Sequence, residues 1–181
     1  MKIGIFDSGL GGLVITKAFI NALPEYDYIY LGDNARTPYG MRSFDVVYKY
    51  TREAVLKLFD MGCRLVILAC NTASAKALRT IQQVDLPRID AQRRVLGVIR
   101  PSVEAVADFA RNGHIGVLAT SGTVASESYL LEIAKIHSEK GFQVSQLACP
   151  MWVPLVENNE IDSPGAAFFV QKYIDILKKH L

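Results

Sequence analysis

The sequence predicts an α/β fold in which mainly parallel sheets are flanked by helices. Short apolar runs rich in β-branched residues recur at residues 2–6, 27–31, 64–68, 95–99, 114–119 and 142–148. Longer segments with apolar residues at helical spacing lie between them, as at residues 13–23 and at residues 44–61, a segment that Ser43 caps and Gly62 ends. Strands that alternate with helices are typical of βαβ units, because parallel strands need a crossover connection.

Two stretches of the chain resemble each other and indicate two similar lobes. Residues 3–8 read Ile-Gly-Ile-Phe-Asp-Ser, and residues 115–120 read Ile-Gly-Val-Leu-Ala-Thr. Each starts a strand with Ile-Gly and runs into a turn that carries a hydroxyl group. Pro87 and the arginine-rich residues 88–94 predict a break and a linker between the lobes. We expect a first lobe at residues 1–95, a second at 96–181, and an active site in the cleft between them.

Composition narrows the classes of function. Half of the 181 residues are hydrophobic, and the net charge of +2 is too small to indicate a nucleic-acid surface. No apolar stretch reaches the length of a membrane span, and the N-terminal residues do not read as a signal peptide, so we expect a cytoplasmic protein. The irregular spacing of Cys63, Cys70 and Cys149 fits neither a disulfide framework nor a zinc site.

A glycine-rich turn, residues 7–12, follows the first predicted strand. A dinucleotide fingerprint would need a third glycine where Val14 stands, and no Gly-Lys-Ser/Thr follows to make a phosphate-binding loop. We therefore exclude a nicotinamide cofactor here. The remaining interpretation is a tight turn with exposed backbone N–H groups, with the Asp7 carboxylate and the Ser8 hydroxyl at its mouth.

Cys70 stands where the predicted strand 64–68 gives way to a helix at residues 74–83. Asn71 or Thr72 is suited to cap that helix. In an open α/β sheet this is the edge where ligands bind, and a helix N-terminus lowers the pKa of a thiol. We therefore expect a reactive Cys70 with a pKa below the ~8.5 of a free cysteine. The alternative is a small buried apolar residue, which is how we interpret Cys63.

The neighbours of Cys70 favour one kind of thiol chemistry. A cysteine protease would need a histidine as general base, and none of the three histidines has sequence neighbours that look catalytic. Lys76 stands where a thiol phosphatase would have arginine, and no Cys-x-x-Cys motif is present. A thiol that acts as a general base on a carbon beside a carboxylate fits these polar neighbours best.

Four segments resemble bacterial glutamate racemases, of the aspartate/glutamate racemase superfamily. They are Ile-Phe-Asp-Ser-Gly-Leu-Gly-Gly at 5–12, Tyr-Leu-Gly-Asp-Asn-Ala-Arg-Thr-Pro-Tyr-Gly at 30–40, Ala-Cys-Asn-Thr-Ala-Ser-Ala at 69–75 and Cys-Pro-Met-Trp-Val-Pro-Leu-Val-Glu at 149–157. The resemblance implies a cytoplasmic isomerase without cofactor or metal that interconverts L- and D-glutamate for peptidoglycan, cell wall biogenesis and cell shape. It also implies a homodimer with a small-molecule substrate and no nucleic-acid or membrane partner.

The resemblance also implies roles for individual residues. Two cysteines flank the α-carbon of the substrate, and Cys70 matches the one associated with the proton of D-glutamate. Asp7 matches a carboxylate that assists this cysteine. The pairs Asp7 and Ser8, Tyr39 and Gly40, and Asn71 and Thr72 match the substrate-binding residues. Glu157 matches a second assisting carboxylate, although a surface loop acid remains an equal interpretation.

One departure from the family pattern stands out. The second catalytic cysteine of the family lies in a Gly-Cys-Thr-His motif, which these 181 residues do not contain. Cys149 does not fit, because Pro150 follows it. We expect a second lobe that is incomplete at its C-terminal end and a chain that is inactive or crippled as given. Alternatives are a racemase of aspartate or another amino acid, and a shortened, non-catalytic protein that binds an acidic amino acid.

Overall fold

The computed structural model describes residues 1–180. The chain divides into two compact units, Met1–Val98 and Ile99–Leu181, and the division falls a few residues beyond the expected one. Within residues 1–180, no helix is long and apolar enough to cross a membrane. Parallel sheets flanked by helices confirm the predicted fold class.

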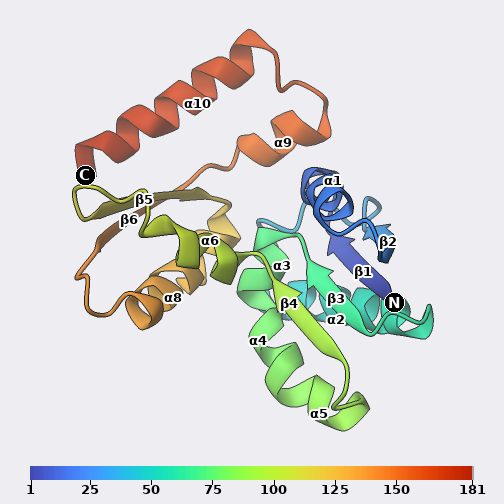
Figure 1. Cartoon of the computed structure of the whole chain (residues 1–181). Coiled ribbons are helices and arrows are strands. Elements are labelled where there is room, and N and C mark those ends of the chain that lie inside the picture. The colour runs from blue at the N-terminus through green and yellow to red at the C-terminus, as the bar shows by residue number, and fades with distance from the viewer. Residues whose placement is uncertain (181) are drawn as a thin grey trace. The chain divides into compact units, whose positions relative to one another are not determined.

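The first unit is built on a four-stranded sheet, drawn from blue to green in Figure 1. Its strands are β1 (Lys2–Asp7), β2 (Asp27–Gly32), β3 (Leu65–Leu68) and β4 (Arg94–Gly97), in the order β2-β1-β3-β4. All neighbouring strands are parallel, and Phe6 lies opposite both Leu31 and Leu68. Because parallel strands end at one edge of the sheet, the residues after β1 and those after β3 are neighbours.

Apolar residues cover both faces of this sheet, as alternation along a strand requires. On one face, Phe6, Val66 and Leu68 pack with buried residues of helix α2 (Phe44–Asp60). On the other face, Ile5 and Ile67 pack with partly buried residues of helix α1 (Gly12–Ala22). A strand buried on both faces has a continuous apolar sequence, which is how these strands were predicted.

The predicted ends of helix α2 are confirmed. Ser43 is its N-cap, and the Ser43 hydroxyl oxygen accepts a hydrogen bond from the Val46 N–H at 3.4 Å. Gly62 lies just beyond its end with φ of +90°, a conformation that a residue with a side chain rarely adopts.

The segment after Cys70 differs from the prediction of one helix, a break at Pro87 and a linker. Four short helical pieces follow one another instead: α3 (Asn71–Lys76), α4 (Leu78–Thr80), a π-helical turn η1 (Ile81–Asp85) and α5 (Leu86–Ile89). Pro87 lies in the first turn of α5, where its missing N–H costs no helical hydrogen bond. The linker interpretation was therefore wrong for Arg88, which belongs to α5, and for Arg94, which begins β4.

The second unit holds a two-stranded parallel sheet of β5 (His114–Ala119) and β6 (Gln143–Ala148), which are paired over six residues. Its helices are α6 (Ile99–Val106), α7 (Ser121–Ala125), α8 (Ser128–Ile136), α9 (Trp152–Glu157) and α10 (Pro164–Leu177), followed by the 3₁₀ turn η2 (Lys178–His180). Helices α7 and α8 are not continuous with each other. Glu127 interrupts them with φ of 55° in the left-handed region.

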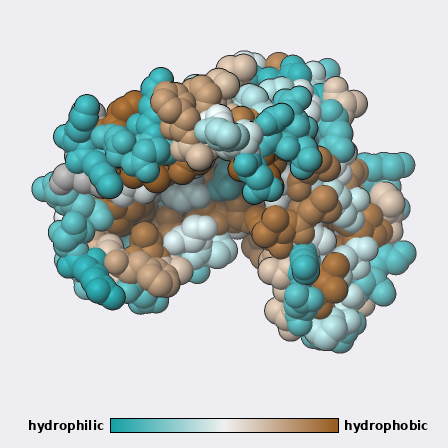
Figure 2. All heavy atoms as spheres, turned by 90° about the horizontal axis from the view of Figure 1, so that it is seen from above, coloured by the Kyte–Doolittle hydropathy of each residue, from teal (hydrophilic) through white to brown (hydrophobic). Residues whose placement is uncertain are grey.

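Large apolar side chains remain on the surface of each unit. Figure 2 shows them as brown spheres among the teal polar residues. In the first unit Val14 of α1 is 77% exposed, and its neighbours Leu10 and Leu13 are also exposed. In the second unit Phe109 is 78% exposed. Helix α1 therefore presents an apolar stripe that no part of its own unit covers.

Candidate active site

Cys70 lies at the N-terminus of α3, at the sheet edge where β3 ends. The cysteine itself is the N-cap, with φ of −82° and ψ of 120°, and its sulfur accepts a hydrogen bond from the Ala73 N–H at 3.4 Å. The expectation that Asn71 or Thr72 caps this helix was therefore wrong, since both lie inside its first turn. Cys70 is only 7% exposed.

Ser8 joins the first strand to this thiol. The Ser8 Oγ and the Cys70 Sγ are 3.3 Å apart, a hydrogen bond across 62 residues of sequence. Strand pairing explains the approach, because the Ala69 N–H donates to the Phe6 carbonyl at 2.8 Å and continues the β1–β3 ladder. The turn after β1 and the helix after β3 therefore place a hydroxyl group beside the sulfur.

The pKa of Cys70 is raised, which contradicts the expected low value. Burial is the largest cause, because it disfavours the thiolate, and the negative charge of Asp7 acts in the same direction. Hydrogen bonds from Ser8 and from the backbone of Ala73 lower the pKa, but by less. Helix α3 has six residues, and its N-terminal amides do not outweigh the burial of the sulfur. Burial also raises the pKa of Cys63 and of Cys149.

Asp7 is buried at the end of β1 and holds the glycine-rich turn. Its Oδ2 accepts hydrogen bonds from the Gly12 N–H at 2.9 Å and from the Gly9 N–H at 3.2 Å. These two amides of the turn, expected to be exposed, are therefore bound by the protein's own carboxylate. An added Cβ on Gly12 would lie 2.7 Å from the Asp7 Cβ, so glycine permits this close approach.

Tyr39 and Gly40 are both buried, on the loop that follows β2. The Tyr39 hydroxyl donates a short hydrogen bond to Asp33, and the ring lies against Phe6 and Tyr50. Burial, followed by the bond to Asp33, raises the pKa of Tyr39, so the phenol stays protonated. The family resemblance assigns Tyr39 to substrate binding, but its hydroxyl is already hydrogen-bonded within the protein.

The first unit gathers most of the predicted residues. Asp7 ends β1, and the other four lie just after β1 or β3 at the same edge of the sheet: Ser8, Cys70, Asn71 and Thr72. Asn71 is exposed, and Thr72 is 3% exposed. Glu157 belongs to the second unit, where it is the last residue of α9, and its catalytic role stays a prediction. Within residues 1–180, no three His, Cys, Asp or Glu side chains are placed to hold a metal ion.

Sequence reasoning missed Asp33 as a member of this region. Its backbone N–H donates to the Asp7 carbonyl at 2.9 Å, and its carboxylate accepts bonds from Tyr39 and Arg36. One signal was available, since an Asp and an Arg three residues apart directly follow β2 at the same sheet edge.

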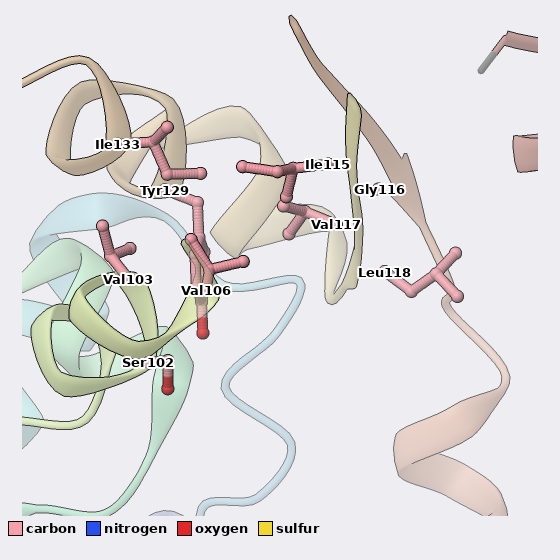
Figure 3. A pocket seen from close by; sticks show the side chains of 9 residues that line it. All are labelled: Ser102, Val103, Val106, Ile115, Gly116, Val117, Leu118, Tyr129 and Ile133. Carbon is pink, nitrogen blue, oxygen red and sulfur yellow. The ribbon is translucent and has the colours of Figure 1, made fainter. Parts of the chain in front are cut away.

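A separate pocket of about 230 Å³ lies within the second unit. Figure 3 shows Val103 and Val106 of α6 facing Tyr129 and Ile133 of α8, with Ile115 and Val117 of β5 across from them. Its lining is mainly aliphatic. None of the predicted site residues lines this pocket.

Comparison with known proteins decides the family. A curated glutamate racemase of Ruegeria sp. (strain TM1040) is 40% identical over 191 residues, which cover 100% of this chain and 68% of the relative. The chain belongs to the glutamate racemase family. A glutamate racemase of Persephonella marina is 42% identical over 177 residues, covering 97% of the chain and 64% of the relative. The chain thus spans somewhat less than two thirds of the length of several such relatives.

Solved structures of glutamate racemases have the same fold as this chain. Isoform RacE1 from Bacillus anthracis matches with a TM-score of 0.88 and 33% identity, over 98% of this chain and 64% of that protein. The enzyme from Francisella tularensis, solved in complex with D-glutamate, matches with a TM-score of 0.84 and 32% identity, over 97% of this chain and 62% of that protein. No protein-family model matches the chain.

Proposed function

We propose that this chain carries the D-glutamate half of a glutamate racemase site, in which Cys70 moves a proton at the α-carbon without a cofactor. The observation that carries the proposal is the Cys70 sulfur, held at 3.3 Å from the Ser8 hydroxyl at the sheet edge, in a chain of this family. The product would be D-glutamate for peptidoglycan, made in the cytoplasm by a homodimer, as the family resemblance implies.

The raised pKa of Cys70 suits a base that attacks a carbon acid. A thiolate of high pKa is a stronger base once it forms, and α-protons of amino acids are very weakly acidic. Substrate supplies part of the charge compensation, because the α-ammonium group of glutamate beside the sulfur would favour the thiolate. Asp7 is the carboxylate whose charge acts on Cys70, and in the proposal it takes the thiol proton.

Substrate recognition in the proposal uses the groups around the sulfur. Ser8, Asn71 and Thr72 supply hydroxyl and amide groups, and the buried loop of Tyr39 and Gly40 supplies backbone rather than the phenol. Glu157 is the second assisting carboxylate in the proposal, as the family resemblance implies. The second cysteine of the family lies in a motif that residues 1–181 do not contain.

Calorimetric titration of this chain with D-glutamate tests the recognition half of the proposal. We expect saturable binding that Asn71→Ala weakens, with D-aspartate binding less tightly because its side chain is one methylene shorter. Preference for aspartate would assign the site to a racemase of aspartate. Absence of binding by either amino acid would refute the assignment of this sheet edge to an acidic amino acid.

A further inference from the structure

We propose that Asp33 is a positioning residue that fixes the loop of Tyr39 and Gly40 against Asp7 and Cys70. The inference rests on the proposed function, since the loop matters to catalysis only if this sheet edge binds glutamate. Asp33 itself touches no reacting atom in this proposal, and it acts through the residues that it holds.

Asp33 joins three parts of the site. Its backbone N–H donates to the Asp7 carbonyl at 2.9 Å, which ties the loop to the end of β1. Its Oδ2 accepts one hydrogen bond from the Tyr39 hydroxyl and another, at 2.6 Å, from the Nε–H of Arg36. The side chain is 9% exposed, so water competes little for these bonds.

Arg36 extends the anchorage to helix α2. Its Nη1 donates to Glu53 at 2.6 Å, and its guanidinium lies 4.1 Å from the centre of the Tyr50 ring. Arg42 closes the loop on itself, because its Nη2 donates to the Arg36 carbonyl at 2.8 Å. The loop is therefore held by its own side chains rather than by regular secondary structure.

The far end of the loop is tied to the helix of the catalytic cysteine. The Lys76 ammonium donates to the Arg42 carbonyl at 2.7 Å, and Lys76 is the last residue of α3, which begins after Cys70. One end of the loop is thus hydrogen-bonded to Asp7, and the other end to Lys76 of α3. A loop fixed at both ends keeps its backbone within the small tolerance that a binding site requires.

The same unit offers a matched control at Asp85. That carboxylate is also 9% exposed and accepts the same two donors, a tyrosine hydroxyl (Tyr48, 2.9 Å) and an arginine Nε–H (Arg52, 2.8 Å). Asp85 lies in the π-helical turn η1 and has no bond to the loop of Tyr39 within the described residues. The variants Asp33→Asn and Asp85→Asn therefore make the same chemical change in two places.

Two measurements on the 181-residue chain test the inference: amide hydrogen exchange of residues 33–42 and calorimetric affinity for D-glutamate. We expect Asp33→Asn to speed exchange in that loop by about tenfold, as the loss of an ordinary hydrogen bond does. We expect it to weaken glutamate binding roughly 10- to 100-fold. Asp85→Asn should speed exchange only around η1 and leave the affinity unchanged. Arg36→Gln, at a half-buried residue, gives a milder variant should Asp33→Asn fail to fold.

Each outcome decides the inference. Unchanged exchange in residues 33–42 would overturn it, whatever happens to glutamate. A loosened loop with unchanged affinity, or equal loss of affinity in Asp85→Asn, would show that Asp33 contributes only to stability. If the parent chain binds no glutamate, the proposed function fails, whereas the exchange data still decide whether Asp33 holds the loop.

Discussion

Cys70 is surrounded by groups that act on its proton in opposite directions. Burial and the charge of Asp7 raise its pKa, and the hydrogen bonds from Ser8 and Ala73 lower it. The thiol is therefore neutral at pH 7 in the absence of substrate. Chemistry at this residue requires a change in the local charge, which a bound ammonium group or proton transfer to Asp7 would provide.

Substitution of Asp7 or Ser8 tests how each side chain changes the pKa of Cys70. Asp7→Asn removes a negative charge but keeps an oxygen for the Gly9 and Gly12 amides, so the pKa of Cys70 should fall. Ser8→Ala removes a hydrogen bond to the sulfur, so the pKa should rise. Rates of Cys70 alkylation by iodoacetamide across pH give both midpoints, with Cys63 and Cys149 in the same samples as internal references. If the Cys70 midpoint stays unchanged or rises in Asp7→Asn, the charge of Asp7 does not raise the pKa of Cys70.

The position of Cys70 and its neighbours at the sheet edge was predictable from the sequence, because the end of a parallel strand locates them without tertiary information, whereas their catalytic and binding roles stay predictions. Asp7, Ser8, Asn71 and Thr72 follow by the same argument. The direction of the Tyr39 side chain was not predictable, because its hydroxyl partner Asp33 is held by Arg36, which is itself anchored 17 residues away at Glu53. The pKa of Cys70 was misjudged because burial of the sulfur is set by packing and not by the helix that follows.

Gly12 sets the distance between helix α1 and the sheet. An added Cβ on Gly12 would lie 2.7 Å from the Asp7 Cβ and 3.0 Å from the Ala69 Cβ, atoms close to the backbone that have little freedom to move. Gly12→Ala should therefore lower the free energy of unfolding by about 1–3 kcal/mol, as overpacking does. Urea unfolding followed by circular dichroism measures the change.

Gly11 is the control for this effect, because it is adjacent in sequence. Its added Cβ would meet only the Asp7 Oδ2, at 3.9 Å, and its backbone is already helical. Gly11→Ala should be neutral or stabilise the protein by about 0.4–1 kcal/mol through the unfolded chain. Equal losses of stability in the two variants would contradict the packing argument.

Helix α3 gives a second prediction. Because the Cys70 side chain caps the helix, Cys70→Ser should keep the unfolding free energy within about 1 kcal/mol, since serine is a favoured N-cap. Thermal unfolding checks this, and Cys70→Val, whose side chain accepts no hydrogen bond, should be less stable. A Cys70→Ser variant that unfolds far more easily would mean that the sulfur's packing outweighs its capping.

Helices and strands were predicted correctly where the sequence carries one dominant signal, such as a run of apolar β-branched residues between two turn-forming residues. β5 was predicted with both of its observed ends, because apolar β-branched residues sit between Gly113 and Thr120. The division of residues 71–89 into four helical pieces was not predicted. It depends on contacts between distant residues, such as the Tyr48–Asp85 hydrogen bond across 37 residues. Pro87 is compatible with either a break or a first helical turn, and the sequence alone does not choose between them.

At the scale of the whole molecule, the chemistry of inversion sets a requirement that one thiol does not meet. Racemisation removes a proton from one face of the α-carbon and delivers another to the opposite face. The family motif for the second cysteine is absent from residues 1–181, and Pro150 follows Cys149 where that motif would have threonine. Loss of one positioned acid or base typically costs about 10²–10⁴-fold in rate.

We therefore expect the 181-residue chain to exchange the α-proton of D-glutamate with solvent without inverting it. Incubation with D-glutamate in D₂O should leave the circular dichroism signal of the amino acid nearly constant, while mass spectrometry of the recovered glutamate shows one added mass unit. L-Glutamate should gain no deuterium, because Cys70 serves only one face of the α-carbon. Cys70→Ser, folded by the criterion above, should abolish the exchange. Rapid loss of the dichroism signal that depends on Cys70 would instead mean that residues 1–181 supply the second acid themselves, and Glu157 and Cys149 would be the first two to replace.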